Sequence, residues 1–261
     1  MAALQNGSKC SRTGVYAPLL KRFAPCPQKN SGVLIPVLWL SKKMKILFIG
    51  NSHVYMHFMP LMLVELVKAC DHGVRLAAEQ CTGEGVSLEW HWKNPATRDL
   101  LTFKRWDYVV LQDRAGGPLE ERQSFEAHAR LLNQEITSRG GQTLFYMTWA
   151  LKSEPETQAE LAEAYSRIAT ELGAKLAPVG LAWQQAHRSD PELDLFHPDG
   201  RHANPIGAYL TACIFYALLL GESPEGLPGK LFIRGKNRVD LDKDQARFLQ
   251  RVAFEIATIK S

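Results

Sequence analysis

Two short segments that lie far apart in the sequence carry side chains that together could activate a serine. Gly50-Asn51-Ser52-His53 follows the apolar run 45–49, and Asp199-Gly200-Arg201-His202 precedes a long apolar stretch. Serine is a weak nucleophile until a histidine accepts its proton, and that histidine needs a carboxylate to fix its tautomer and to stabilise the imidazolium. Ser52, His202 and Asp199 supply these three groups, so their joint placement predicts a nucleophilic serine.

Each segment also has a simpler interpretation. Asn and Ser are common in ordinary turns between a strand and a helix, and a chain of this length often contains an Asp-x-x-His pair by chance. A metal site is a further alternative, since His197, Asp199 and His202 are all metal-binding residue types. Their spacing, however, matches no established ligand pattern.

Other polar residues could complete such a site. Gln112 ends an expected strand, where its amide could donate a hydrogen bond to an oxyanion or simply bind a neighbouring loop. The side chains that we expect to line a substrate pocket are His53, His91, Asp113 and Trp149. Packing in the core is the commoner fate of aromatic residues, and Asp113 could equally form an ion pair with Arg114.

The elements that must position these residues alternate between strand and helix. Short apolar runs predict strands at 45–49, 74–78, 107–111, 143–147 and 175–177. Apolar periodicity and end signals predict helices at 60–70, 122–138, 156–172, 206–220 and from Asp242 to about 259, with a weakly helical segment at 88–103.

This alternation predicts an α/β fold, a three-layer α/β/α sandwich with a parallel sheet of about five strands. In such sheets the functional loops lie beyond the carboxyl ends of the strands. Ser52, the loop 82–85 and Gln112 all fall at such ends.

The composition bounds the class of protein. A chain of 261 residues with 46% hydrophobic and 22% charged residues is typical of a soluble globular protein. Residues 1–43 contain seven Lys and Arg and no acid, which exceeds the net charge of +4, so the rest is acidic and nucleic acid is not an expected partner.

The first 43 residues carry no clear signal of a helix or a strand. Their apolar stretch 33–40 is interrupted by Pro36, is too short to span a bilayer, and lacks a cleavage site of a secretory signal. We expect a basic, disordered leader at 1–43, either an over-extended start or a transit peptide, and a catalytic domain at 44–261. Five scattered cysteines predict a reducing compartment without a disulfide framework, hence a cytoplasmic protein without membrane partners.

These motifs resemble those of the SGNH, or GDSL-like, hydrolase superfamily, whose fold is flavodoxin-like. Gly50-Asn51-Ser52 resembles its first block, and Asp199 with His202 its last. Gly85, with Gly83 as the fallback, resembles the glycine of the second block, and Gln112 stands where the family has Asn. The segments 48–52, 109–112, 148–150 and 207–210 look like those of an uncharacterised bacterial branch.

The resemblance implies an esterase in which Ser52 attacks, His202 moves the proton and Asp199 orients His202. It implies an oxyanion hole from Ser52, Gly85 and Gln112, and neither a metal nor an organic cofactor. Without a long apolar lid, and with Trp90 and Trp92 near the second loop, we expect acetyl or other short-acyl esters of a carbohydrate or small polar alcohol. An acyltransferase with the same triad and a non-catalytic carbohydrate-binding module remain the alternatives, and no pattern sets an oligomeric state.

Overall fold

A parallel sheet of five strands lies at the centre of the protein, in the order β2-β1-β3-β4-β5. The computed structural model describes residues 42–70 and 73–259. The strands are β1 (Lys42–Gly50), β2 (Val74–Thr82), β3 (Tyr108–Leu111), β4 (Gln142–Tyr146) and β5 (Lys175–Ala177). All four strand pairs are parallel, as the sequence predicts.

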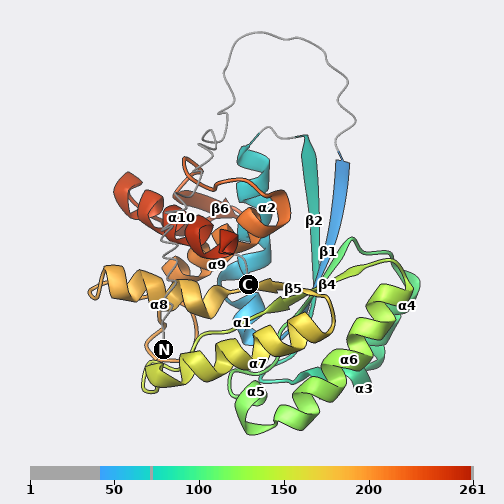
Figure 1. Ribbon diagram of the computed structural model, residues 1–261. Helices are drawn as coiled ribbons and strands as arrows, with labels where there is room; N and C mark the ends of the chain where they lie inside the picture. Colours follow the sequence, from blue (N-terminus) through green and yellow to red (C-terminus); the bar gives the residue numbers. More distant parts are fainter. Residues whose placement is uncertain (1–41, 71–72, 260–261) are drawn as a thin grey trace, which may run out of the picture.

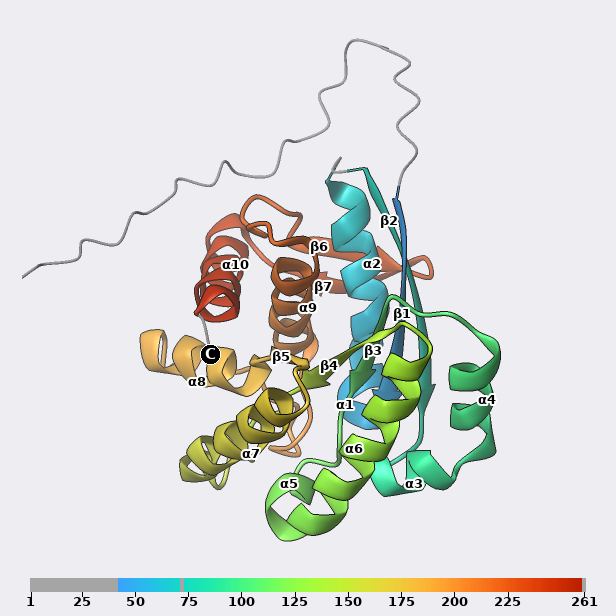
Figure 2. The ribbon, with the colours of Figure 1, turned by 45° about the vertical axis from the view of Figure 1, so that its right-hand side comes forward.

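Helices cover both faces of the sheet, so the predicted three-layer α/β/α sandwich is confirmed (Figures 1 and 2). One face carries α2 (Met59–Ala69), α8 (Val179–Ser189), α9 (Pro205–Leu220) and α10 (Lys243–Thr258). The other carries α3 (Leu88–Lys93), α4 (Pro95–Phe103), α6 (Arg122–Ser138) and α7 (Gln158–Glu171). Four short helical segments are α1 (Ser52–Tyr55), η1 (Met56–Phe58), α5 (Gly117–Glu120) and η2 (Pro155–Thr157).

The alternation of side chains along β1 explains the two cores. Ile46 and Phe48 pack into the core on the α9 side, whereas Leu47 and Ile49 pack into the core on the α6 side. Successive strand residues point to opposite faces of a sheet. A strand covered on both sides must therefore be apolar throughout, which is why this run identifies β1 in the sequence.

Helix α9 shows the end signals that the sequence analysis uses. The Asn204 side chain accepts hydrogen bonds from the backbone N–H groups of Ile206 and Gly207, and Pro205 occupies the first turn. Gly221 ends the helix with a φ of 68°. Because α9 contacts both α2 and α10, almost every side of it is buried, which explains its continuous apolar sequence.

Several elements differ from the sequence-based expectation. The segment 88–103 forms two helices, α3 and α4, because Asn94 ends the first and caps the second, in which Pro95 follows. Helix α8 was not among the expected helices. The antiparallel hairpin of β6 (Lys230–Ile233) and β7 (Lys236–Asp240) was not expected, since its strands are short and β7 is polar.

The start of the sheet also needs correction. β1 begins at Lys42 rather than Lys45, because the backbones of Lys42 and Lys43 pair with Val74 and Arg75 although their side chains are exposed. The expected boundary between residues 43 and 44 therefore falls inside a strand. The remainder of the expected leader, residues 1–41, lies outside the described residues.

Two further observations bear on the expected class of protein. Cys81 and Cys213 are free thiols, whereas Cys70 is disulfide-bonded, a departure at that residue from the expected absence of a disulfide framework. Within the described ranges, no helix has the length and apolar character needed to cross a membrane.

Candidate active site

The first part of the site is the turn that follows β1. A β-carbon on Gly50 would collide with the Gln112 side chain and come within 2.8 Å of Val54, so only glycine fits there. Asn51 then caps the short helix α1 by accepting a hydrogen bond from the backbone N–H of His53. Ser52 is consequently the first residue of α1, at the carboxyl end of the sheet.

Asn51 holds this turn against two neighbouring loops. Its backbone N–H donates to Oε1 of Gln112 over 2.8 Å, and its side-chain Nδ2 donates to the carbonyl of Val86 over 3.0 Å. The loops after β2 and β3 are thereby joined to the residue that precedes Ser52. Sequence reasoning missed this role, although Asn directly before a helix is a standard capping signal.

The second part of the site is the turn that carries His202. Asp199 Oδ1 accepts hydrogen bonds from the backbone N–H groups of Arg201 and His202, both over 2.9 Å. Gly200 has a φ of +67°, a left-handed conformation that favours glycine and closes the turn. The Trp149 indole donates to the carbonyl of Arg201 over 2.9 Å and fixes the turn to the loop after β4.

The fold brings these two parts together in one chain of hydrogen bonds. Ser52 Oγ lies 2.8 Å from His202 Nε2, and His202 Nδ1 lies 2.6 Å from Asp199 Oδ2. The carboxylate assigns the proton of the ring to Nδ1, which leaves Nε2 to accept the Ser52 hydroxyl proton. Although partial burial opposes ionisation of Asp199, hydrogen bonds from the His202 ring and the two backbone N–H groups hold its pKa well below the ordinary range.

Two glycines follow β2, and their surroundings separate them. The N–H of Gly83 donates to the carbonyl of Gly50 over 3.3 Å, so it is already used. Gly85 lines the same pocket as Ser52 and has a φ of +59°. Gly85 is therefore better placed than Gly83 to donate to a bound oxygen.

Gln112 does not lie where an oxyanion donor is needed. Its side chain is fully buried, its Oε1 accepts from Asn51, and its Nε2 donates to the backbone carbonyl of Asp113. Gln112 is not among the residues that line the Ser52 pocket. The expectation of an oxyanion role is corrected, because the longer amide folds back beneath the nucleophile turn and supports Asn51 instead.

The Ser52 pocket has a volume of about 430 Å³ and is bordered by charged as well as apolar side chains. His53 and Trp149, two of the expected pocket residues, line it. Their rings lie 5.0 Å apart, and the His53 ring lies 5.3 Å from that of His202. Burial, aided by the nearby charges of His202 and Arg201, lowers the pKa of His53 to about 3, so this ring stays neutral beside the triad.

The other two expected pocket residues are buried beneath the surface. His91 Nε2 donates to the carbonyl of Gly50 over 2.9 Å, its Nδ1 lies 3.0 Å from Thr97 Oγ1, and burial lowers its pKa to about 4. Asp113 is also buried and accepts a hydrogen bond from the backbone N–H of Arg114. Neither lines the Ser52 pocket, so both are corrected to supports of the loops that do.

A strained segment follows helix α1 in the chain and contacts the residue next to His202. His57 and Phe58 have φ values of 53° and 59°, an unusual conformation for residues other than glycine. His57 Nε2 donates a hydrogen bond to the carbonyl of Ala203 over 3.0 Å. The sequence analysis assigns no role to His57, and no local pattern marks this contact.

The metal interpretation involves the same turn. His197 Nδ1 lies 3.3 Å from Asp199 Oδ2, but the His197 side chain is half exposed and has no contact with Ser52. Among the residues that the structure describes, no group of three or more His, Cys, Asp or Glu side chains is arranged to hold a metal ion.

Several solved structures have a similar fold. A candidate SGNH hydrolase from Slackia heliotrinireducens aligns at 27% identity and a TM-score of 0.57, over 68% of this chain and 100% of that one. A DUF4886 family protein from Bacteroides uniformis aligns at 21% identity and a TM-score of 0.68, over 82% of this chain and 94% of that one. This chain has an SGNH hydrolase-like fold.

The SGNH hydrolase-like fold has further neighbours. An acetylxylan esterase from Geobacillus stearothermophilus aligns at 14% identity and a TM-score of 0.53, over 70% of this chain and 95% of that one. No protein-family model and no curated protein matches the chain. At 14% identity the likeness to the acetylxylan esterase is one of fold alone.

Proposed function

We propose that this protein is a serine hydrolase that cleaves carboxylic esters through Ser52, His202 and Asp199. The observation that supports this function is the unbroken chain from Ser52 Oγ to His202 Nε2 at 2.8 Å and from His202 Nδ1 to Asp199 Oδ2 at 2.6 Å. The serine at its end lines a pocket, so an ester can reach it.

In the first half of the reaction, His202 Nε2 takes the proton of Ser52 while Oγ forms a bond to the acyl carbon. The carbonyl oxygen becomes an oxyanion, towards which the backbone N–H groups of Ser52 and Gly85 donate. The bond to the alcohol oxygen then breaks, and the alcohol leaves with the proton held by His202.

In the second half, water replaces the alcohol. His202 Nε2 takes a proton from the water, whose oxygen attacks the acyl-Ser52 ester, and the collapse of the second oxyanion returns the proton to Ser52 Oγ. Asp199 remains ionised throughout and stabilises the imidazolium that forms in each half.

The proposed substrates are short-acyl esters, acetyl above all, of a carbohydrate or another small polar alcohol. The pocket is small and carries Glu84, Arg114, Glu154 and Arg201 on its walls, which suits a polar partner. That acetylxylan esterases share the fold is consistent with this choice.

A fluorophosphonate probe tests this function directly, because it labels only an activated serine. We expect labelling of the wild type and of Ser153→Ala, a control serine in an exposed loop near the pocket, and none of Ser52→Ala. Hydrolysis of an aryl acetate should fall by several orders of magnitude in Ser52→Ala alone.

Persistent labelling of Ser52→Ala would rule out Ser52 as the nucleophile. A wild type that binds glycans but is neither labelled nor active would instead be a binding module. A wild type that transfers the acyl group to an added alcohol faster than to water would be an acyltransferase.

A further inference from the structure

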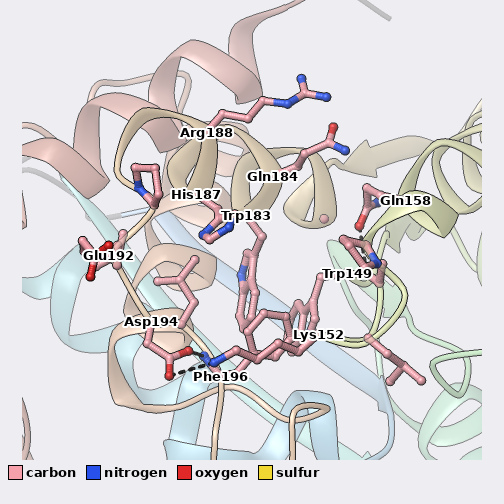
Figure 3. Close-up of a pocket in the computed structure, with 17 residues that line it drawn as sticks. Trp149, Lys152, Gln158, Trp183, Gln184, His187, Arg188, Glu192, Asp194 and Phe196 are labelled. Atoms are coloured by element: carbon pink, nitrogen blue, oxygen red, sulfur yellow. Dashed lines mark hydrogen bonds and ion pairs between the residues drawn. The ribbon is translucent and has the colours of Figure 1, made fainter.

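A second, larger pocket lies next to the Ser52 pocket (Figure 3). Its volume is about 600 Å³. Trp149, Ala150 and Leu151 line both pockets. The loop after β4, helix α8 and the segment 191–196 enclose it. Because α8 was not expected from the sequence, this pocket was not expected either.

The base of this second pocket is apolar and rigid. The rings of Trp149 and Trp183 stack with centroids 3.8 Å apart and an interplanar angle of 3°, and Phe196 packs edge-on against Trp183. Leu193 and Leu195 add aliphatic surface. An apolar ring or a short alkyl group that enters here leaves water for an apolar surface that is already ordered.

The charges at the rim favour a neutral occupant. Two basic residues, Lys152 and Arg188, and two acidic ones, Glu192 and Asp194, line the pocket. Lys152 Nζ lies 3.1 Å from Asp194 Oδ2, an ion pair drawn in Figure 3. Because the two signs balance, neither an anionic nor a cationic ligand is selected.

The position of the second pocket indicates which half of an ester it would receive. His202 protonates the leaving alcohol, so the alcohol oxygen must lie next to His202 Nε2. The second pocket adjoins the His202 turn, since the segment 191–196 leads into that turn and Trp149, which lines both pockets, donates to the carbonyl of Arg201. Phe196 pairs with Ala203, and the N–H of His197 donates to the carbonyl of His202 over 2.8 Å.

We propose that the second pocket binds the alcohol half of the ester, as a neutral apolar ring or alkyl group that lies beyond the ester bond. This inference rests on the proposed function and narrows its alcohol to one that carries such a group. The short acyl group and the polar part of the alcohol stay in the Ser52 pocket, and only the apolar group of the alcohol extends into the second pocket.

The test compares acetates of ethanol and 2-phenylethanol, whose leaving groups have similar basicity, so that differences report binding. We expect KM of the purified full chain to be about tenfold lower for the phenylethyl ester, because the pocket buries the ring. Gln184→Trp should fill the pocket and abolish this preference. Gln185→Trp, on the same helix but outside the pocket lining, should retain it, and His187→Trp serves as a second filling variant.

An acyl series provides the opposite arm. The ratio of KM for ethyl hexanoate to KM for ethyl acetate should be the same in the wild type and in Gln184→Trp. A preference for phenylethyl that survives both filling variants, or is absent from an active wild type, would overturn the inference. If KM is lower for ethyl hexanoate than for ethyl acetate in the wild type and this difference disappears in Gln184→Trp, the pocket binds the acyl half, and the inference is overturned.

Failure of the proposed function is a separate result. If the chain hydrolyses neither acetate, titration of 2-phenylethanol against tryptophan fluorescence still tests the pocket. Saturable binding in the wild type and Gln185→Trp, lost in Gln184→Trp, would support an apolar site, and no binding would refute it.

Discussion

Two histidines contact the same carboxylate oxygen of Asp199, but only one also contacts Ser52. His202 Nδ1 is 2.6 Å from Oδ2 and His197 Nδ1 is 3.3 Å from it. We expect His202→Ala to lower kcat by several orders of magnitude and His197→Ala to lower it by less than about tenfold, because only His202 can move the serine proton. Aryl acetate hydrolysis measures both. Equal losses would place the two rings in one shared role, as in a metal site.

Gln112 supports the turn that precedes Ser52. Gln112→Ala leaves the buried N–H of Asn51 without its acceptor, which costs about 1–3 kcal/mol of unfolding free energy. We therefore expect kcat and the melting temperature to fall together, as measured by acetate hydrolysis and thermal unfolding. Gln80→Ala, an exposed glutamine on β2, is the control. A loss of kcat at an unchanged melting temperature would restore Gln112 as an oxyanion donor.

At the scale of elements, the packing of α8 on α9 depends on one glycine. A β-carbon on Gly207 would lie 2.5 Å from both the carbonyl oxygen of Leu195 and Cζ2 of Trp183. Gly→Ala within a helix ordinarily adds about 0.5–1 kcal/mol of stability, but here the collision outweighs that gain. We expect Gly207→Ala to lower the melting temperature and to change the fluorescence of Trp183. A melting temperature at or above that of the wild type would show that α8 moves aside freely.

Elements with strong local signals could be predicted, and those that depend on packing could not. β5 and α6 have the expected bounds, because apolar period and stop residues define them. Helix α8 has the spacing Val179, Ala182, Trp183, Ala186, which indicates a helical face in retrospect. The sequence also indicated Ser52, Asp199 and His202, but not the burial of Gln112, His91 and Asp113, since depth beneath a loop leaves no local pattern.

At the scale of the whole molecule, the buried histidines predict how stability depends on pH. Burial lowers the pKa of His53 to about 3 and that of His91 to about 4, from an ordinary 6.5. As the pH falls below about 6.5, the unfolded chain binds protons that the folded chain refuses, so stability is lost. Asp113 acts in the opposite sense, because burial raises its pKa from 3.8 to about 6. Its contribution to stability is lost as the pH rises from about 3.8 to about 6.

Denaturant unfolding at pH 8 and pH 5 measures this dependence. His91→Leu should be less stable than the wild type at pH 8, because Gly50 and Thr97 lose their partner. Its further loss between pH 8 and pH 5 should be smaller, by up to about 1.4 kcal/mol per pH unit below 6.5. An identical loss in both proteins would mean that the pKa of His91 is the same in the folded and the unfolded state.

The left-handed pair His57–Phe58 has a consequence for attempts to make this protein more heat-resistant. Backbone strain of this kind costs on the order of 1–3 kcal/mol per residue, so replacing either residue with glycine removes a cost and is an obvious choice for thermostabilisation. The same change at position 57 would delete the contact with Ala203, next to His202. Selection for melting temperature alone would therefore favour variants in which the general base is less firmly held, and the gain in stability would come with a loss of turnover.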